Sequence, residues 1–276
     1  MSDKRQPGRE RTGSGGGYEL LSVIGGSSTS TVHLAESGGR RFAIKVLDRH
    51  LAGDETVLGR FMREARLASQ LDHPSIVPVL DVVEIEGRPA MVMPYLSGGN
   101  LRERPPMGVE ELSEMAASIA DALSFAHRKG VIHRAVRPEN MLFDDAGRVA
   151  LTDFGSAHVG DLVGLTTSTL LSSAPEYTAP ELLFGEPADP RSDLYSLGAV
   201  LCERLTGKPP ARDGSPVFSK EVPEWMREIV QALLAPAEER LSSAQRLSEL
   251  IRSHTAPAER STRPCIGCGG STPGDL

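Results

Sequence analysis

Three short motifs in a fixed order decide how this sequence is interpreted. They read VIHRAVRPENML at residues 131–142, LTDFG at residues 151–155 and APE at residues 179–181. Such motifs suggest a functional site only when particular strands and helices surround them. The flanking sequence must therefore supply that arrangement.

The sequence before these motifs has the pattern of an antiparallel sheet. Short apolar runs separated by turn residues predict strands at residues 18–24, 32–35, 42–47, 77–83 and 90–93. One stretch, residues 55–71, instead has apolar side chains at spacings of three and four, which indicates a helix. The first part of the chain is therefore expected to be a β-rich lobe containing one helix.

The sequence after Gly98-Gly99 is dominated by helical spacing. It predicts helices at residues 109–128, 193–205, 223–234 and 242–253. A β-rich lobe joined by a short hinge to an α-rich lobe is an α+β arrangement, which tends to place a ligand cleft at the junction.

Composition sets the expected boundaries of this arrangement. Residues 1–17 are polar, basic and rich in Gly and Ser, so we expect a disordered tail. The folded domain is expected over residues 18–253, with a first lobe at about 18–93, a hinge at about 94–100 and a second lobe at about 101–253. Residues 254–276 return to Pro, Ser, Gly and charged side chains and are expected to be a flexible tail.

Composition and charge exclude several classes of protein. The 276 residues, 39% of them hydrophobic, are enough for one sizeable core or two modest lobes. The net charge of -7 provides no broad basic field, so we expect no nucleic-acid partner. The few cysteines suggest no disulfide framework. Because no apolar run is long enough to span a bilayer and the start has no signal-peptide pattern, we expect no membrane span and a cytoplasmic location.

Two features of the β-rich part indicate a site for an anion. The turn IGGSSTSTV at residues 24–32 has small residues that let backbone amides approach phosphate oxygens, although a flexible polar hairpin explains the same residues equally well. Lys45 ends an apolar strand, where an ammonium group is costly to bury without an anion. Glu64, on the helix that follows, is its natural partner.

Together with these features, the three motifs give the sequence a resemblance to a known family. From roughly Tyr18 to Ser253 it resembles a protein kinase domain of the bacterial serine/threonine type, with every landmark in order. The resemblance implies a two-lobed protein kinase fold, in which a small antiparallel β-sheet lobe with one helix precedes a larger, mostly α-helical lobe. It also implies ATP as the ligand, with magnesium.

The resemblance assigns roles to polar residues on both sides of the expected cleft. Lys45 would contact the α- and β-phosphates and pair with Glu64, while Asn140 and Asp153 would hold magnesium. Two further matches concern the scaffold. Glu181 would pair with Arg240, and Asp193 would brace the 131–142 loop.

The adenine ring would lie among apolar side chains and beside the hinge MVMPYL, residues 91–96. Pro94 in that hinge has no N–H but still offers its carbonyl oxygen to the ring. The residues expected to contact adenine are Val32, Ala43, Met93 as gatekeeper, Pro94, Leu96 through its backbone, and Leu142.

The sequence departs from the family at the position of the catalytic base. The family's H-R-D is His133-Arg134-Ala135, so a methyl group replaces the carboxylate that accepts the substrate proton. General-base catalysis is worth roughly 10²- to 10⁴-fold, or about 3 to 5 kcal/mol of barrier, so phosphate transfer is expected to be very slow. Ala174 likewise replaces the threonine that usually bonds this base. Glu139 lies close in sequence, but family members commonly carry an acidic residue there without using it as a base.

The expected phosphate contacts are altered too. Gly25 keeps the first glycine of the loop pattern, whereas Ser27 and Ser30 replace the second and third. The Cβ of Ser27 limits how closely the loop can approach a phosphate, so weaker nucleotide binding is an expectation from this change. Arg137 replaces the family's lysine two positions after the missing base and keeps the charge, although the two side chains grip a phosphate oxygen differently.

Two polar segments allow both a functional and a purely structural interpretation. Hydroxyl side chains at positions 166–169, 172 and 173 lie where the family is activated by phosphorylation, here by an upstream kinase, but a flexible polar loop fits equally well. Cys265 and Cys268 resemble half of a zinc ribbon. Because they supply two of the four ligands that zinc requires, an incomplete remnant is favoured over a zinc site.

These observations favour a cytoplasmic pseudokinase that binds ATP, with or without magnesium, and acts as a scaffold or regulator toward a protein partner. The hypothesis depends on two alanines, Ala135 and Ala174. It also depends on four residues that match the family, which are Lys45, Glu64, Asn140 and Asp153. A slow but active serine/threonine kinase is one alternative, because phosphoryl transfer relies mainly on positioning and electrostatics. A scaffold without nucleotide is the other.

Overall fold

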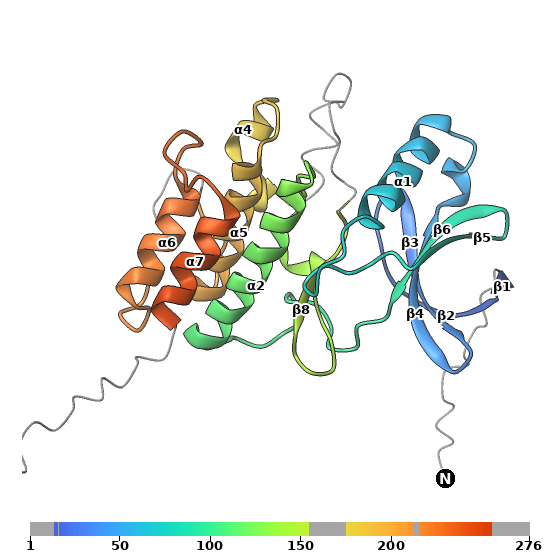
Figure 1. The fold of residues 1–276 in the computed structure, drawn as a ribbon, viewed down its shortest axis with the longest axis horizontal. Coiled ribbons are helices and arrows are strands. Elements are labelled where there is room, and N and C mark those ends of the chain that lie inside the picture. Colours follow the sequence, from blue (N-terminus) through green and yellow to red (C-terminus); the bar gives the residue numbers. More distant parts are fainter. Residues whose placement is uncertain (1–13, 16, 155–174, 212–215, 256–276) are drawn as a thin grey trace, which may run out of the picture.

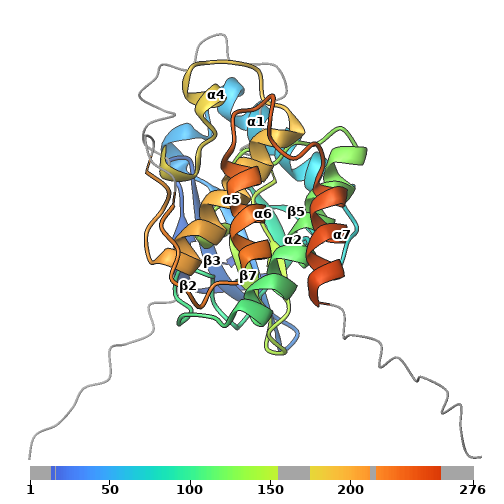
Figure 2. The same ribbon diagram turned by 90° about the vertical axis from the view of Figure 1, so that its left-hand side faces the viewer.

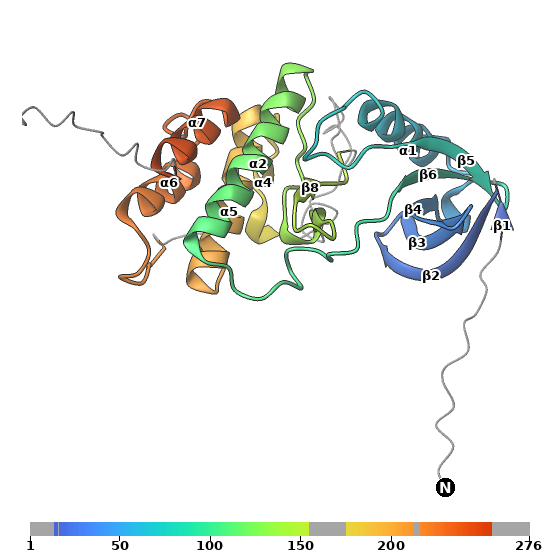
Figure 3. The ribbon, with the colours of Figure 1, turned by 60° about the horizontal axis from the view of Figure 1, so that its bottom comes forward.

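A β-sheet lobe and a helical lobe lie side by side along the long axis of the structure (Figure 1). This computed structural model describes residues 14, 15, 17–154, 175–211 and 216–255. The order of the two lobes in the chain and the α+β class are as predicted. The chain crosses from the sheet lobe to the helical lobe after strand β6 (Arg88–Pro94), as Figure 3 shows.

The sheet is antiparallel, with the strand order β1-β2-β3-β4-β6-β5. Helix α1 (Glu55–Ala68) follows β4 in the chain, and its N-terminus is capped by Asp54, whose carboxylate accepts hydrogen bonds from the Thr56 and Val57 amides. The strands are β1 (Ser14–Gly15), β2 (Tyr18–Gly26), β3 (Ser30–Ser37), β4 (Arg40–Leu47), β5 (Asp81–Ile85) and β6 (Arg88–Pro94).

The alternation of side chains along the strands separates two small cores. Side chains of one face of the sheet, including Ile44 and Val92, pack together away from α1. On the other face, Leu47 and Met91 pack against Phe61 of α1. Because residues two apart share a face of a strand, Lys45 lies on the same face as Leu47, toward α1.

The helical lobe is built around α5, whose residues from Ser192 to Cys202 are all buried. Helix α5 packs against α2, α6 and α7 (Figure 2). The elements are α2 (Val109–Arg128), α4 (Pro180–Leu183), α5 (Pro190–Thr206), α6 (Glu224–Leu234), α7 (Ala244–Thr255), the hairpin of β7 (Met141–Phe143) and β8 (Val149–Leu151), and three short 3₁₀ turns, η1 (Arg49–Leu51), η2 (Pro138–Asn140) and η3 (Pro175–Tyr177).

The strand expected at residues 77–83 is wrong in its position, because β5 begins at Asp81. Ile76 and Val77 are bound to the other lobe instead, whereas the Leu80 amide donates to the Val92 carbonyl of β6 at 2.8 Å. The amide of Val77 donates to the carbonyl of Leu151 in β8 at 2.9 Å, and Pro78 has no N–H with which to join the sheet. The sequence pattern could not show this, since Val77 is buried here as it would be in a sheet.

Several boundaries differ from those expected. Ser14 and Gly15 fall within the expected disordered tail, yet they pair with β2. Helix α5 begins at Pro190, three residues before the expected start, because Asp189 forms a capping box with Ser192. Helix α7 continues to Thr255. The hairpin of β7 and β8 and the short α4 were not predicted. The rest of both expected tails lies outside the described residues.

None of the helices in the described part of the chain combines the length and the apolar composition needed to cross a membrane.

Gly198 allows α5 and α6 to approach each other. A Cβ at this position would lie 2.6 Å from the Cβ of Leu233. We therefore expect Gly198→Ala to lower the free energy of unfolding by about 1–3 kcal/mol, as measured by urea denaturation. Gly59→Ala in α1 is the matched control, because its Cβ would meet nothing within 4 Å. Alanine there should stabilise the helix by up to about 1 kcal/mol, and equal effects of the two substitutions would contradict the prediction.

Candidate functional site

Lys45 joins the two lobes by contacting a carboxylate from each. Its Nζ donates to Oε1 of Glu64 in α1 at 2.6 Å and to Oδ1 of Asp153, after β8, at 3.0 Å. Burial alone would lower the pKa of Lys45, but the two carboxylates raise it above its usual range. Burial likewise would raise the pKa of Asp153, yet the charge of Lys45 holds it below its usual value. The ammonium group and the Asp153 carboxylate therefore stay charged at neutral pH.

Asp193, fully buried in α5, holds the start of the 133–140 segment. Its Oδ2 accepts a hydrogen bond from the His133 amide at 2.8 Å and lies 2.8 Å from Nε2 of His127. Its Oδ1 accepts one from the Arg134 amide at 2.7 Å. Arg134 has φ of 62°, a left-handed conformation that is unfavourable for a residue with a Cβ. The buried carboxylate therefore stabilises a backbone geometry that the local sequence would not adopt alone.

His133 connects this segment to the residues before Asp153. Its Nε2 lies 2.8 Å from the Thr152 carbonyl oxygen, and its Nδ1 lies 3.1 Å from the Ala135 amide nitrogen. A carbonyl only accepts and an amide only donates, so the neutral imidazole protonated at Nε2 satisfies both contacts. The ring also packs edge-on against Phe154, with 4.6 Å between centroids. Burial lowers the pKa of His133, which favours the same neutral form.

Asn140 lies beside the position of the missing base. Its Nδ2 donates to the Ala135 carbonyl at 2.8 Å, and its own backbone carbonyl accepts from the Thr152 amide at 2.9 Å. These bonds place Asn140 next to the strand that leads to Asp153. Among the described residues its side-chain oxygen has no hydrogen-bond donor, so it can act as a ligand.

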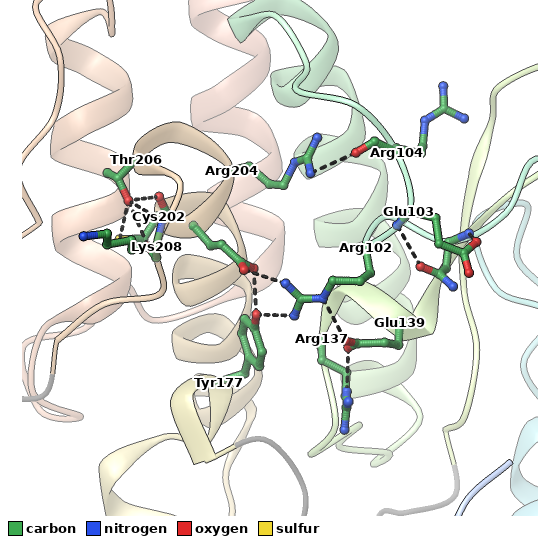
Figure 4. Close-up of polar contacts among 12 residues, drawn as sticks. Arg102, Glu103, Arg104, Arg137, Glu139, Tyr177, Cys202, Arg204, Thr206 and Lys208 are labelled. Carbon is green, nitrogen blue, oxygen red and sulfur yellow. Dashed lines mark hydrogen bonds and ion pairs between the residues drawn. The ribbon is translucent and has the colours of Figure 1, made fainter. Parts of the chain in front are cut away.

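Glu139 is held by two arginines and is a weak proton acceptor (Figure 4). Its Oε1 accepts from Nε of Arg102 at 2.9 Å, and its Oε2 accepts from Nε of Arg137 at 2.8 Å. Burial would raise the pKa of Glu139, but the hydrogen bonds from the arginines lower it to about 2. A general base near pH 7 requires a far higher pKa.

Most of the residues expected around adenine come together where the lobes meet. Ala43, Leu96 and Leu142 pack against a small cluster that includes the buried Met93. Val32 lies opposite Lys45 in the β3–β4 ladder and opposite Gly25 in the β2–β3 ladder. Pro94 ends β6, opposite Phe42.

The turn between β2 and β3 is closed by hydrogen bonds of Ser27. Its amide donates to the Ser30 carbonyl at 2.7 Å, and its Oγ accepts from the Thr29 and Ser30 amides, both at 3.2 Å. Two amides that could face a phosphate are thus bonded to a side chain of the same turn. The serine therefore affects this turn through hydrogen bonding as well as through the bulk of its Cβ.

Several predicted features lie outside the described residues. They are Ala174, the hydroxyl side chains at positions 166–169, 172 and 173, and Cys265 with Cys268. Within the described ranges, no group of three or more His, Cys, Asp and Glu side chains gathers as a metal site would.

Sequence reasoning missed Arg102, Tyr177 and Glu203. The Arg102 guanidinium contacts the other two side chains as well as Glu139. These partners lie 37, 75 and 101 positions away in the chain, and no motif connects them. The pattern of charges in the sequence carries no signal for such a cluster.

A family model described as "Protein kinase domain" matches residues 18–265. The chain belongs to the protein kinase family. In this kinase domain the sheet with α1 is the N-terminal lobe and the helical part is the C-terminal lobe. The predicted scaffold contact is present: Arg240 Nη1 donates to Glu181 Oε1 at 2.7 Å.

Curated relatives of the domain are bacterial serine/threonine kinases. The chain is 40% identical over 211 residues to "Serine/threonine-protein kinase PknB" of Mycobacterium leprae, covering 72% of this chain and 34% of that protein. It is 37% identical over 201 residues to "Serine/threonine-protein kinase PrkC" of Bacillus subtilis, covering 71% and 31%. The chain thus spans about a third of the length of these relatives.

A solved structure shares the fold over most of its length. The kinase domain of Mycobacterium tuberculosis PknI superposes with a TM-score of 0.66 at 27% identity. The match covers 87% of this chain and 96% of that structure.

Acid should destabilise the domain through His133. Because burial holds the pKa of this histidine below its ordinary value of 6.5, the unfolded chain binds a proton there that the folded chain does not. Stability from this group is present above pH 6.5 and is lost as the pH falls below it, by at most about 1.4 kcal/mol per pH unit. Urea denaturation at about pH 7.5, 6.5 and 5.5 measures the slope.

His133→Phe should make this slope shallower. It should not abolish it, because burial also lowers the pKa values of His33 and His73. A slope unchanged by the substitution would show that His133 does not contribute.

Proposed function

We propose that this kinase domain binds Mg-ATP between its lobes, transfers phosphate far more slowly than an ordinary kinase, and acts as a pseudokinase on a protein partner. One observation carries the proposal: the Lys45, Glu64 and Asp153 contacts are formed, while position 135 offers only a methyl group. Nucleotide-binding groups are thus retained where the base is absent.

The residues present fit a magnesium ion together with a nucleotide. The Asp153 carboxylate and the side-chain oxygen of Asn140 are the hard oxygen ligands that magnesium prefers, and the phosphates of the nucleotide would supply others. Lys45 would neutralise phosphate charge. Asp153 and Asn140 would hold the ion, whose positive charge would offset that of the phosphates. Apolar side chains such as Ala43 and Leu142 would contact the adenine ring.

The surroundings of Ala135 support impaired catalysis. Glu139 is the acidic residue nearest to it in sequence, and both of its oxygens are bound by arginines. With no carboxylate to orient and deprotonate a hydroxyl, the loss is expected to be about 10²- to 10⁴-fold.

A slow serine/threonine kinase is a second candidate. The Lys45–Glu64 ion pair, at 2.6 Å, supports it, because active kinases require this pair. Positioning of the terminal phosphate would then provide most of the catalysis. A scaffold without nucleotide has one supporting observation, the closed turn around Ser27.

Mg-ATP should raise the melting temperature of the unmodified chain and not that of Lys45→Met. A ligand at about 100 times its Kd adds roughly 2.7 kcal/mol of stability, which corresponds to a shift of about 5 °C for a domain of this size. Lys220→Met is the matched control, because it removes an exposed lysine in the other lobe. If the unmodified chain shows no shift, the scaffold without nucleotide is favoured and the proposal fails.

Restoring the carboxylate should restore activity. We expect Ala135→Asp to transfer radiolabelled phosphate from ATP to a generic protein substrate or to itself at least 100-fold faster than the unmodified chain, about the lower end of the contribution of a general base. The double variant Ala135→Asp/Asp153→Asn controls for contaminating kinases. Transfer by the unmodified chain at roughly 1–100 per second would contradict the proposal.

A further inference from the structure

Arg102 lies at the centre of a polar cluster in the helical lobe (Figure 4). Its Nε donates to Glu139, its Nη1 donates to Glu203 Oε1 at 2.5 Å, and its Nη2 contacts the Tyr177 hydroxyl. Tyr177 in turn donates to Glu203 Oε2 at 2.6 Å. Because the guanidinium is planar and its donors point in fixed directions, three partners leave it one orientation. Arg102 is therefore a rigid support for the Glu139 carboxylate.

Glu139 connects Arg102 to Arg137. Its two oxygens are bound by different arginines, so its carboxylate bridges Arg102 and Arg137. The bond to Arg137 is made through Nε, at 2.8 Å. The terminal nitrogens of Arg137 have no partner in the part of the chain that the structure describes. They remain available for an anion.

Backbone hydrogen bonds place Arg137 near the residues expected to bind the nucleotide. The Arg137 carbonyl accepts a hydrogen bond from the Asn140 amide at 3.0 Å, and the Asn140 carbonyl accepts one from the Thr152 amide at 2.9 Å. Thr152 directly precedes Asp153, whose carboxylate accepts a hydrogen bond from Lys45. Arg137 in the helical lobe and Lys45 in the sheet lobe therefore supply basic groups to the same part of the molecule.

We propose that Arg102 is a positioning residue, which acts through Glu139 to orient Arg137 toward the terminal phosphate of ATP. This inference rests on the proposed function, because it requires a nucleotide beside Asp153. An arginine has many rotamers and loses entropy when it binds. Holding its Nε in advance reduces that loss, so the terminal nitrogens meet the phosphate already oriented.

The test compares Mg-ATP with Mg-ADP, which lacks the terminal phosphate. Dissociation constants are measured by calorimetry for the unmodified chain, Arg102→Leu, Arg137→Leu and the double variant. Both single substitutions should weaken Mg-ATP binding by about tenfold, the value of one charge-assisted contact, and change Mg-ADP binding by less than about twofold. The double variant should bind no more weakly than Arg137→Leu, because Arg102 acts through Arg137.

Two further variants separate positioning from general stability. Glu139→Ala removes the carboxylate that connects Arg102 to Arg137, so it should weaken Mg-ATP binding as much as Arg102→Leu does. It therefore tests the inference even if Arg102→Leu does not fold. Tyr177→Phe removes a hydroxyl from the same cluster but leaves both contacts of Glu139, so it should bind both nucleotides like the unmodified chain.

The outcomes distinguish this inference from the proposed function. Equal weakening of Mg-ATP and Mg-ADP by Arg102→Leu and Glu139→Ala would overturn the inference. The inference would also be overturned if the double variant bound Mg-ATP more weakly than Arg137→Leu does. The same holds if Glu139→Ala kept the preference of the unmodified chain for Mg-ATP over Mg-ADP. If the unmodified chain binds neither nucleotide, the proposed function itself fails and the inference with it.

Discussion

The buried carboxylate of Asp193 is the contact on which the arrangement of the polar residues depends. A charge in the interior is unfavourable unless hydrogen bonds compensate it, and Asp193 accepts bonds from the backbone of His133 and Arg134 and contacts His127. It thereby fixes the left-handed backbone at Arg134. Helix α5, which carries Asp193, is itself buried, so the 133–140 segment is attached to the most rigid part of the helical lobe.

Two charge networks adjoin this segment. Lys45 with its two carboxylates joins the sheet lobe to Asp153, and the Glu139 carboxylate in the helical lobe is bound by both Arg102 and Arg137. Ala135 contributes only backbone groups, which bond to His133 and Asn140. None of these contacts uses the side chain at position 135, so the kinase fold does not depend on a carboxylate there.

Prediction from sequence succeeded where an interaction depends on local periodicity. Alternation along β4 places Lys45 on the face toward α1, and the helical spacing of α1 turns Glu64 to the same side, so their pairing could be anticipated. Prediction failed where one segment had two possible neighbours. The residues around Val77 have the composition of a strand, but the Val77 amide bonds to Leu151 of the helical lobe and β5 does not extend to it. Ser27 similarly bonds its own turn, which composition alone could not indicate.

The sequence by itself determined the kinase fold, the order of the lobes, the residues of the candidate nucleotide site and the absence of a carboxylate at position 135. These follow from residue identity and from spacing along the chain. Only the tertiary structure decided that Glu139 is bound by two arginines, Arg102 and Arg137, and that Arg102 also contacts Tyr177 and Glu203. Those contacts join residues far apart in the sequence, and a charged side chain takes as its partner whichever opposite charge the packed helices bring within reach.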